Sequence, residues 1–469
     1  MGTIAVELGY RDSARRSRVN ETSFRHHGPA GRASNLEERL KEYPELKAKI
    51  EAMLAMMEDA GGDVAKAAEA ERRIIEELRQ MGNEVLQSWA RRQQEKKETE
   101  YNAKPGVNRK EKKPLLVHAT GKNRNRRTDL HPRSPGAADS TLLRVCGSGM
   151  AWVFGSLQRA MTDFGADEAF AGAAAKRQEP YGIEVPVSAV GRFTEEHGAA
   201  MLAQEKAKSD WPDRAGVPVV ISEMEGSMLP VVETAEAGVR EVPIDRRKTR
   251  QVGGKEARLA LAHPPGSVTP IFGATLGSVE EGGERLAVGA WEAGAGSQTK
   301  SHGVGDGAVW IMEQMEAQFG TQAKYLVDFY HRCDYLAAAG EVIAGNDPPA
   351  WMKEKVDWLK DNRWKEVLEA LRPSLEPANI PDPEAPVRAC FRYLSNHSDF
   401  LDYQGALAAG LPIGSGEIES GHRYVFQHRL KIAGSWWKTE NLRKMIALRV
   451  LRANRGWEDY WSNVHQEAA

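Results

Sequence analysis

Residues 217–232 read VPVVISEMEGSMLPVV, and this stretch decides the fold class because it opens a series of extended segments. Val217 to Ile221 is a continuous apolar run, and Met228 to Val232 follows a glycine. Two later apolar stretches, at 259–262 and 268–274, are bounded by Pro and Gly. These patterns predict a meander of strands in this part of the chain.

The region that follows the meander has parallel βα character. A short segment ends at Asp306, a helix is predicted from Ala308 to Phe319, and an apolar strand is predicted from Tyr325 to Phe329. A strand, a helix and a further strand in succession favour parallel pairing. We therefore expect a mixed α/β fold whose sheet is RNase H-like.

Composition limits the remaining possibilities. The chain has 469 residues, enough for two or three folding units, and a formal net charge of −2 from 64 basic and 66 acidic side chains. Binding to a polyanion must therefore rest on local basic clusters. Cys146, Cys333 and Cys390 lack the spacing of a zinc or disulfide framework. No apolar run is long enough for a membrane span, so we expect a cytoplasmic protein that is not exported.

Two segments before residue 150 have contrasting patterns. Apolar residues at steps of three and four, from Ile74 to Trp89, predict a helical module that acts as a scaffold or, alternatively, as a DNA-end-binding or self-association element. Residues 102–134 are strongly basic and include Lys112 and Lys113. Such a run attracts phosphate without reading sequence, although a solvated linker has the same composition.

Three acids are candidates for metal-dependent phosphodiester chemistry, which needs convergent carboxylates. Glu225 ends the first buried strand, Asp306 lies at a glycine-rich strand-to-helix corner, and Glu419 lies in the first turn of a helix that a glycine-containing turn opens. Each has an ordinary alternative, because Asp-Gly pairs form turns and an early helical Glu interacts with the helix dipole.

Other polar residues near these acids are weaker candidates for metal binding. Glu223 is two residues before Glu225 and faces the same side of a strand, so it is an alternative ligand. Glu417 is expected to be a capping or surface residue. Asp328 and His331 are candidate metal ligands, but a structural polar corner is the favoured interpretation. On a helix, Glu419 would share a face with two further residues, His422 and Arg423.

Several runs carry a family resemblance. They are DGAVWI at 306–311, YLVDFYH at 325–331 and LPIGSGEIES at 411–420, followed by Arg429-Leu430-Lys431 and Trp436-Trp437. These runs resemble the ISKra-type insertion-sequence transposases, relatives of the Mutator-like group. Further similarity at 245–250, 255–258 and 448–454 extends it over about 150–461.

The resemblance implies a set of three metal-binding acids, Asp-Asp-Glu, on an RNase H-like core. The second and third acids of the family fall on Asp306 and Glu419, which together with Glu225 would bind two Mg²⁺ or Mn²⁺ ions. Four neighbouring residues would hold these ligands in place without binding the metal themselves: Asp328, His331, His422 and Arg423.

The expected organisation has seven segments. They are 1–35, a disordered N-terminus; 36–100, a helical N-terminal module; 101–150, a basic linker that is poorly ordered or frameshifted; 151–215, a helical linker domain; 216–331, the first part of the RNase H-like core; 332–410, a helical insertion; and 411–469, a C-terminal helical part carrying the third acid.

The chain departs from the family at two places. The family has Glu-Met-Asp-Gly-Ser-Met where this chain has Glu225 in place of the first aspartate. The extra methylene moves that carboxylate outward by more than about 1 Å, which metal geometry tolerates poorly. Residues 104–150 also lack the family's pattern, and a frameshifted stretch in a decaying element would explain this.

The expected function is a DNA transposase that cleaves element ends and joins the freed 3′-hydroxyl to target DNA. Its partners would be terminal inverted repeats, target DNA and a second copy of the chain, in a bacterial nucleoid. The candidate DNA contacts are Lys112, Lys113, Arg246, Arg247, Lys248, Arg250, Arg429, Lys431, Trp436 and Trp437. The two tryptophans either stack on unpaired bases or pack on the core, and packing is favoured.

Two alternatives remain open from sequence. A decaying transposase that retains only DNA binding would fit the Glu225 substitution and the unusual basic segment. A metal-dependent nuclease that does not transpose would fit the carboxylates alone.

Overall fold

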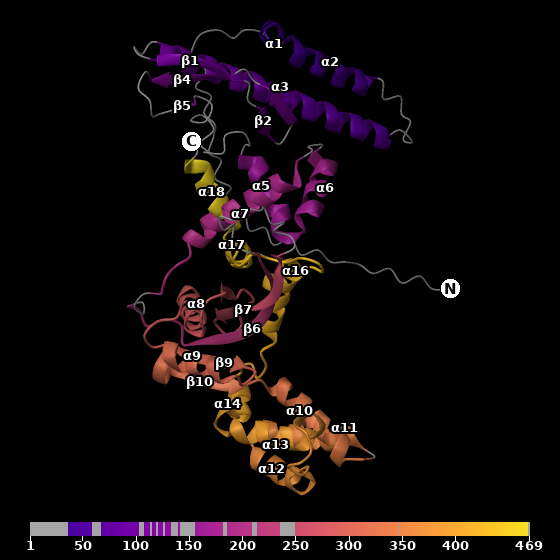
Figure 1. Cartoon of the computed structure of the whole chain (residues 1–469), viewed down its shortest axis with the longest axis vertical. Coiled ribbons are helices and arrows are strands. Elements are labelled where there is room, and N and C mark those ends of the chain that lie inside the picture. Colours follow the sequence, from indigo (N-terminus) through magenta and orange to yellow (C-terminus); the bar gives the residue numbers. More distant parts are fainter. Residues whose placement is uncertain are drawn as a thin grey trace, which may run out of the picture. The chain divides into compact units, whose positions relative to one another are not determined.

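A computed structural model describes most of the chain from residue 36 onward (Figure 1). The described ranges are 36–58, 67–102, the strands between 107 and 140, 155–181, 185–208, 213–234, 249–345 and 347–467. Residues 1–35, which the sequence predicts to be disordered, lie outside them, as do Arg246, Arg247 and Lys248. The chain divides into two compact units, Met1–Val85 and Leu86–Ala469.

The first unit is helical in its described part, as its periodicity predicts. It contains α1 (Leu36–Leu40), α2 (Pro44–Glu58) and the beginning of α3 (Ala67–Asn102). An ion pair of 3.1 Å between Lys49 Nζ and Glu77 Oε2 joins α2 to α3.

Short strands occupy the described part of the basic linker. They are β1 (Val107–Lys112), β2 (Leu115–His118), β3 (Gly121–Arg124), β4 (Arg127–Pro132) and β5 (Asp139–Ser140). β4 pairs antiparallel with β1 and β5, and β2 pairs antiparallel with β3. Backbone pairing needs no apolar side chains, so a charged sequence is compatible with it. The expectation of poor order in this linker stays a prediction for hydrogen exchange.

A five-stranded mixed sheet forms the centre of the second unit (Figure 1). Its strands are β6 (Val219–Glu233), β7 (Gln251–His263), β8 (Ile271–Thr275), β9 (Lys300–Gly305) and β10 (Ala323–Val327), in the order β10-β9-β6-β7-β8. The first three are an antiparallel meander, and β9 and β10 run parallel to β6 and to each other. Helices α8 (Val279–Glu292) and α9 (Val309–Phe319) make the crossovers. The mixed α/β class is therefore as predicted.

The structure differs from the sequence prediction at three elements. The predicted strands at 217–221 and 228–232 are one continuous strand, β6, because its pairing with β7 is unbroken. Helix α8 was not predicted, although Ser278 caps it by accepting a hydrogen bond from the amide of Glu281. Strand β10 ends before Asp328, because that residue caps the next helix.

Because side chains alternate along the strands, the two faces of the sheet pack against different elements. Met224 and Ala260 belong to a core with α8 and α9, whereas Leu259 and Leu261 pack against the C-terminal helices. Successive side chains point to opposite faces of a strand, so Glu223 and Glu225 lie on the face opposite Met224. The acids of β6 therefore face the C-terminal helices.

Helices make up the rest of the second unit. Before the sheet lie α5 (Gly155–Asp167), α6 (Phe170–Tyr181) and α7 (Val187–Ala203). After β10 come α10 (Phe329–Ile343), α11 (Pro348–Lys360), α12 (Trp364–Leu371), α13 (Pro386–Asn396) and α14 (Tyr403–Ala408), with the short 3-10 turns η3 (Gly320–Gln322), η4 (Arg372–Ser374), η5 (Asp382–Glu384) and η6 (Ser398–Phe400). The C-terminal part has α15 (Gly416–Gly421), the π-helix η7 (His422–Gln427), α16 (His428–Leu430), α17 (Thr439–Ala453) and α18 (Trp457–Glu467). None of the described helices has the length and apolar character needed to cross a membrane.

Candidate functional site

Strand pairing brings the first two candidate acids together. The parallel ladder between β6 and β9 ends with the pair Glu223 and Val304, and Glu225 and Asp306 each follow that pair by two residues. Neighbouring strands lie about 5 Å apart, so the two carboxylates start from adjacent backbone positions. Asp306 is exposed and Glu225 is partly buried.

Glu225 is electrostatically coupled to both other acids. Burial, together with the negative charges of Glu419 and Asp306, raises its pKa to about 7 against an opposing effect of Lys431. Its Oε2 atom is buried, makes no hydrogen bond with the described residues and lies 3.4 Å from Nε2 of His422. The region thus gathers negative charge around an unsatisfied carboxylate oxygen.

His422 faces this carboxylate as a neutral side chain. Burial lowers the pKa of its imidazole to about 4, so it carries no charge near pH 7. The helix changes from α to π geometry at His422, and such wide turns occur often at functional sites. Contrary to the expected common face, His422 points inward, while Glu419 and Arg423 are exposed.

Glu223 holds the helix that carries Glu419. Its Oε2 atom accepts a 2.8 Å hydrogen bond from the amide of Ile418, in the first turn of α15. The side chain is 1% exposed, and burial raises its pKa to about 8. Its other oxygen, Oε1, is buried and has no hydrogen-bond partner in the part of the chain that the structure describes. Glu223 therefore attaches the first turn of α15 to β6, and this role was not predicted from the sequence.

Asp328 anchors the loop that leads into α15. It caps α10 by accepting a 2.8 Å hydrogen bond from the amide of His331, and it accepts bonds of 2.5 and 2.6 Å from the amide and Oγ of Ser415. Both of its oxygens are thereby engaged. His331 contacts Tyr335 and Tyr393 edge-on. The structural polar corner favoured from sequence is what the structure contains.

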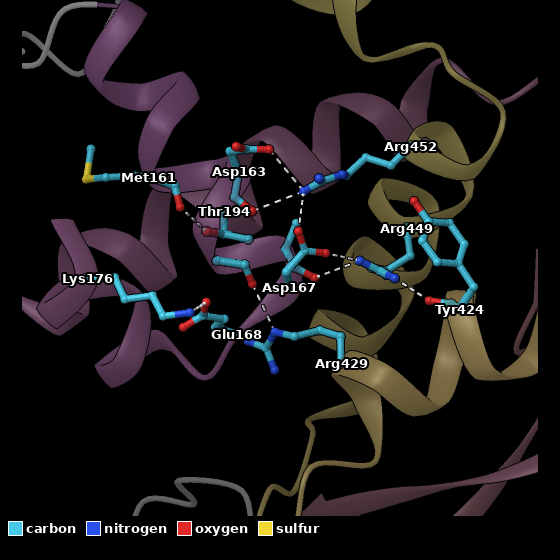
Figure 2. Close-up of polar contacts among 12 residues, drawn as sticks. Met161, Asp163, Asp167, Glu168, Lys176, Thr194, Tyr424, Arg429, Arg449 and Arg452 are labelled. Carbon is cyan, nitrogen blue, oxygen red and sulfur yellow. Dashed lines mark hydrogen bonds and ion pairs between the residues drawn. The ribbon is translucent and has the colours of Figure 1, made fainter. Parts of the chain in front are cut away.

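Buried arginines join the C-terminal helices to α5 (Figure 2). Arg449 donates to the carbonyls of Tyr424 and Val425, both within the π-helix, and pairs with Asp167. Its guanidinium also donates to the carbonyl of Ala166 at 3.3 Å. One side chain therefore ties the end of α5 to the π-helix that begins at His422.

The turn at Asp306 and Gly307 is held by a helix far along the chain. Tyr393 Oη donates to the Asp306 carbonyl at 2.5 Å, and His397 Nε2 lies 2.9 Å from the Gly307 carbonyl. Neither residue was a candidate from the sequence. They lie at the C-terminal end of α13, and nothing in the local sequence links that end to Asp306.

The donor set fits hard divalent cations in its chemistry. Carboxylate oxygens are the ligands that Mg²⁺ and Mn²⁺ prefer, and Glu225 has an unsatisfied buried oxygen beside two coupled acids. Among the described residues, however, no three His, Cys, Asp or Glu side chains are already gathered closely enough to hold a metal ion.

The predicted DNA contacts separate into accessible and buried residues. Arg250, Lys431 and Trp436 are exposed, and Lys431 Nζ donates to Ser227 Oγ beside the acids. Arg429 and Trp437 are 2% and 6% exposed, so their assignment as DNA contacts is corrected. The side chains of Lys112 and Lys113 lie outside the described residues.

The burial of those two residues has a clear cause. Trp437 Nε1 donates to the Leu430 carbonyl, and the Trp437 backbone pairs with β6 through the amide of Val232. The Arg429 guanidinium lies 4.8 Å from the ring centroids of both Phe170 and Trp437. Packing onto the core, the alternative favoured from sequence for the tryptophans, is therefore correct for Trp437, whereas Trp436 is half-exposed.

No protein-family model matches the chain, and neither does any curated protein.

Proposed function

We propose that this protein is a metal-dependent DNA transposase that cleaves the ends of an insertion sequence and joins them to target DNA. The observation that carries the proposal is the coupling of Glu225 to both Asp306 and Glu419 where β6 and β9 lie side by side. These are the acids that the resemblance to ISKra-type transposases singles out.

The topology of the sheet supports an RNase H-like core. Numbered within the sheet, the strands run in the order 5-4-1-2-3, with three antiparallel strands followed by two that are parallel to the first. That arrangement is the one expected of an RNase H-like sheet. The first two acids on adjacent central strands, and a third on a helix after an α-helical insertion, agree with the order that the resemblance implies.

Each acid would contribute carboxylate oxygens to two divalent cations. Such cations, when bound, activate the attacking oxygen and stabilise the leaving oxygen of a phosphodiester. The protein's own contribution is to hold the acids: Glu223 and Asp328 anchor α15, and the β6–β9 pairing ends two residues before Glu225 and Asp306. Lys431, exposed next to Glu225, is positioned to contact a backbone phosphate.

A DNA-binding relic is the second candidate, and the Glu225 substitution favours it. The longer side chain already contacts His422 at 3.4 Å, and it occupies the position where the family has an aspartate. Such a protein would bind element ends without cutting them.

Cleavage of a labelled duplex that carries the element's terminal repeat tests the proposal. With Mg²⁺ or Mn²⁺ we expect nicking at the repeat boundary and, with target DNA present, strand-transfer products. Asp306→Asn and Glu419→Gln should each abolish both reactions without weakening DNA binding, because phosphate contacts come from Lys and Arg.

The same assay separates the alternatives. Binding without cleavage at any metal concentration would support the relic, and metal-dependent cleavage without strand transfer would support a nuclease. Cleavage that survives both acid substitutions would refute the assigned site.

A further inference from the structure

The main-chain carbonyls of Asp306 and Gly307 are both held by α13. Tyr393 Oη donates to the Asp306 carbonyl at 2.5 Å, and His397 Nε2 lies 2.9 Å from the Gly307 carbonyl, while its Nδ1 lies 2.7 Å from the carbonyl of Tyr393. The two side chains come from 87 and 90 residues further along the chain. Tyr393 lies in the last turns of α13 and His397 directly follows its last residue, so the C-terminal end of this helix contacts both carbonyls of the turn.

The turn is fixed from its other side as well. The amide of Gly307 donates to Tyr325 Oη at 3.2 Å, and the amide of Ala308 donates to Asp306 Oδ1 at 2.9 Å. Gly307 has a φ of 90°, and a Cβ atom there would lie 2.9 Å from His397 Nε2. Four backbone polar groups of the turn that carries the Asp306 carboxylate are therefore held: two amides and two carbonyls.

Tyr393 is itself held in place by its neighbours. Its ring stacks on Tyr335 with centroids 4.3 Å apart, and the Arg332 guanidinium lies 5.2 Å from the Tyr393 centroid. Arg332 is 0% exposed, and no guanidinium nitrogen has a hydrogen-bond partner in the described part of the chain. A buried cation without hydrogen bonds is stabilised by the aromatic faces around it, which orders these rings.

We propose that Tyr393 and His397 are positioning residues for the second metal-binding acid, and that the α10–α14 segment serves as its support. This inference rests on the proposed function, because it gives Asp306 the role of a metal ligand. Without the two side chains the turn is free to rotate its peptide planes, and the Asp306 carboxylate loses its fixed direction. A displacement near 1 Å costs about 100-fold in rate.

The test compares Tyr393→Phe and His397→Ala with a matched control. Tyr403→Phe removes a comparable hydrogen bond to a carbonyl outside the turn, because Tyr403 Oη donates at 2.9 Å to Val327, which pairs with Gly305 in the neighbouring strand. His397→Gln retains a side-chain N–H donor and serves as the rescue variant. Mn²⁺ affinity is measured by electron paramagnetic resonance without DNA, and cleavage, hydrogen exchange of residues 303–310 and cooperative unfolding are measured in parallel.

We expect Tyr393→Phe and His397→Ala to weaken Mn²⁺ binding about tenfold, to lower cleavage by about 10- to 100-fold and to speed exchange of residues 303–310. Tyr403→Phe should leave Mn²⁺ affinity unchanged, and His397→Gln should recover part of the loss.

Two outcomes would overturn the inference. One is unchanged Mn²⁺ affinity and exchange in folded Tyr393→Phe and His397→Ala proteins, and the other is an equal loss in Tyr403→Phe. If Tyr393→Phe fails to unfold cooperatively, the comparison of His397→Ala with His397→Gln decides alone. The parent and Asp306→Asn test the proposed function separately: equal Mn²⁺ binding by these two proteins refutes the metal site, while the exchange result still decides whether α13 holds the turn.

Discussion

Glu225 combines the strongest functional argument with the clearest departure from the pattern of the transposase family that the sequence resembles. Its pKa is raised to about 7 by burial, by Glu419 and by Asp306, so it faces the charges that a cation would neutralise. Its side chain is one methylene longer than the aspartate of the family. The contact with His422 at 3.4 Å leaves it little room to withdraw.

We predict that Glu225→Asp raises Mg²⁺-dependent cleavage by about tenfold or more, because a shorter side chain removes a displacement near 1 Å from the metal site. Initial rates on an end-containing duplex measure this, and binding of the same duplex should hardly change. A folded Glu225→Asp protein that cleaves no faster than the parent would show that residue 225 does not limit metal geometry.

A second prediction at the residue scale concerns His197 and the pH dependence of the free energy of unfolding. Burial lowers the pKa of His197 to about 4, below the value of about 6.5 in an unfolded chain. Its Nε2 lies 3.0 Å from Gln158 Oε1 and its Nδ1 lies 2.8 Å from Tyr460 Oη, which suits a neutral ring that donates to the former and accepts from the latter. The unfolded chain therefore binds more protons between about pH 4 and 6.5, and stability falls as the pH falls through that window.

We expect His197→Gln to reduce that fall by up to about 1.4 kcal/mol per pH unit, the limit for one proton. Urea unfolding of parent and variant from pH 4 to 7 measures the difference. The two stability curves should converge toward low pH; parallel curves would contradict a neutral buried His197.

At the scale of one element, α15 carries two glycines in very different surroundings. A Cβ atom at Gly421 would lie 2.7 Å from Phe272 Cε1 and 3.2 Å from Leu259 Cδ2, whereas nothing lies within 4 Å of one at Gly416. Gly421 thus allows the end of α15 to approach β7 and β8 closely. The following π-helix begins from this contact.

We predict that Gly421→Ala destabilises the protein by about 1–3 kcal/mol, the usual effect of overpacking a core. Gly416→Ala, on the same helix, should be neutral or slightly stabilising because alanine favours helix over glycine. Chemical denaturation of both variants tests the pair, and equal stabilities would argue against close packing at Gly421.

Across the second unit, a buried network couples the first helices to the last (Figure 2). Arg449 is 1% exposed and reaches α5 and the π-helix together, whereas Arg452, more exposed, pairs with Asp163 at 3.1 Å and Asp167 at 3.0 Å. Removing a buried hydrogen-bonding side chain lowers stability more than removing an exposed one, because water cannot reach the polar groups that lose their partner.

Arg449→Met should therefore lower the free energy of unfolding by about 3 kcal/mol, because it removes a buried donor from three carbonyls and leaves Asp167 with Arg452 alone. For Arg452→Met we expect about 1 kcal/mol or less. Denaturant midpoints and slopes measure both changes. An effect of Arg452→Met as large as that of Arg449→Met would contradict the ranking by burial.

The sequence by itself determined the mixed α/β class, the meander and the order of the three acids. Apolar runs and glycine corners are local signals, and they locate strand ends such as the one before Asp306. The capping pattern at Ser278 was equally local and could have revealed α8. Asp328 as a polar corner likewise followed from its place after an apolar strand.

Only the tertiary structure decided which residues hold the acids. Glu223 meets Ile418 and Tyr393 meets Asp306 across 195 and 87 residues of chain, and no local period encodes such pairs. The burial of Arg429 and Trp437 was equally invisible, because a basic or aromatic residue has the same sequence signal on a surface as in a core. Secondary structure follows largely from neighbouring residues, whereas burial and hydrogen-bond partners depend on how distant elements pack together.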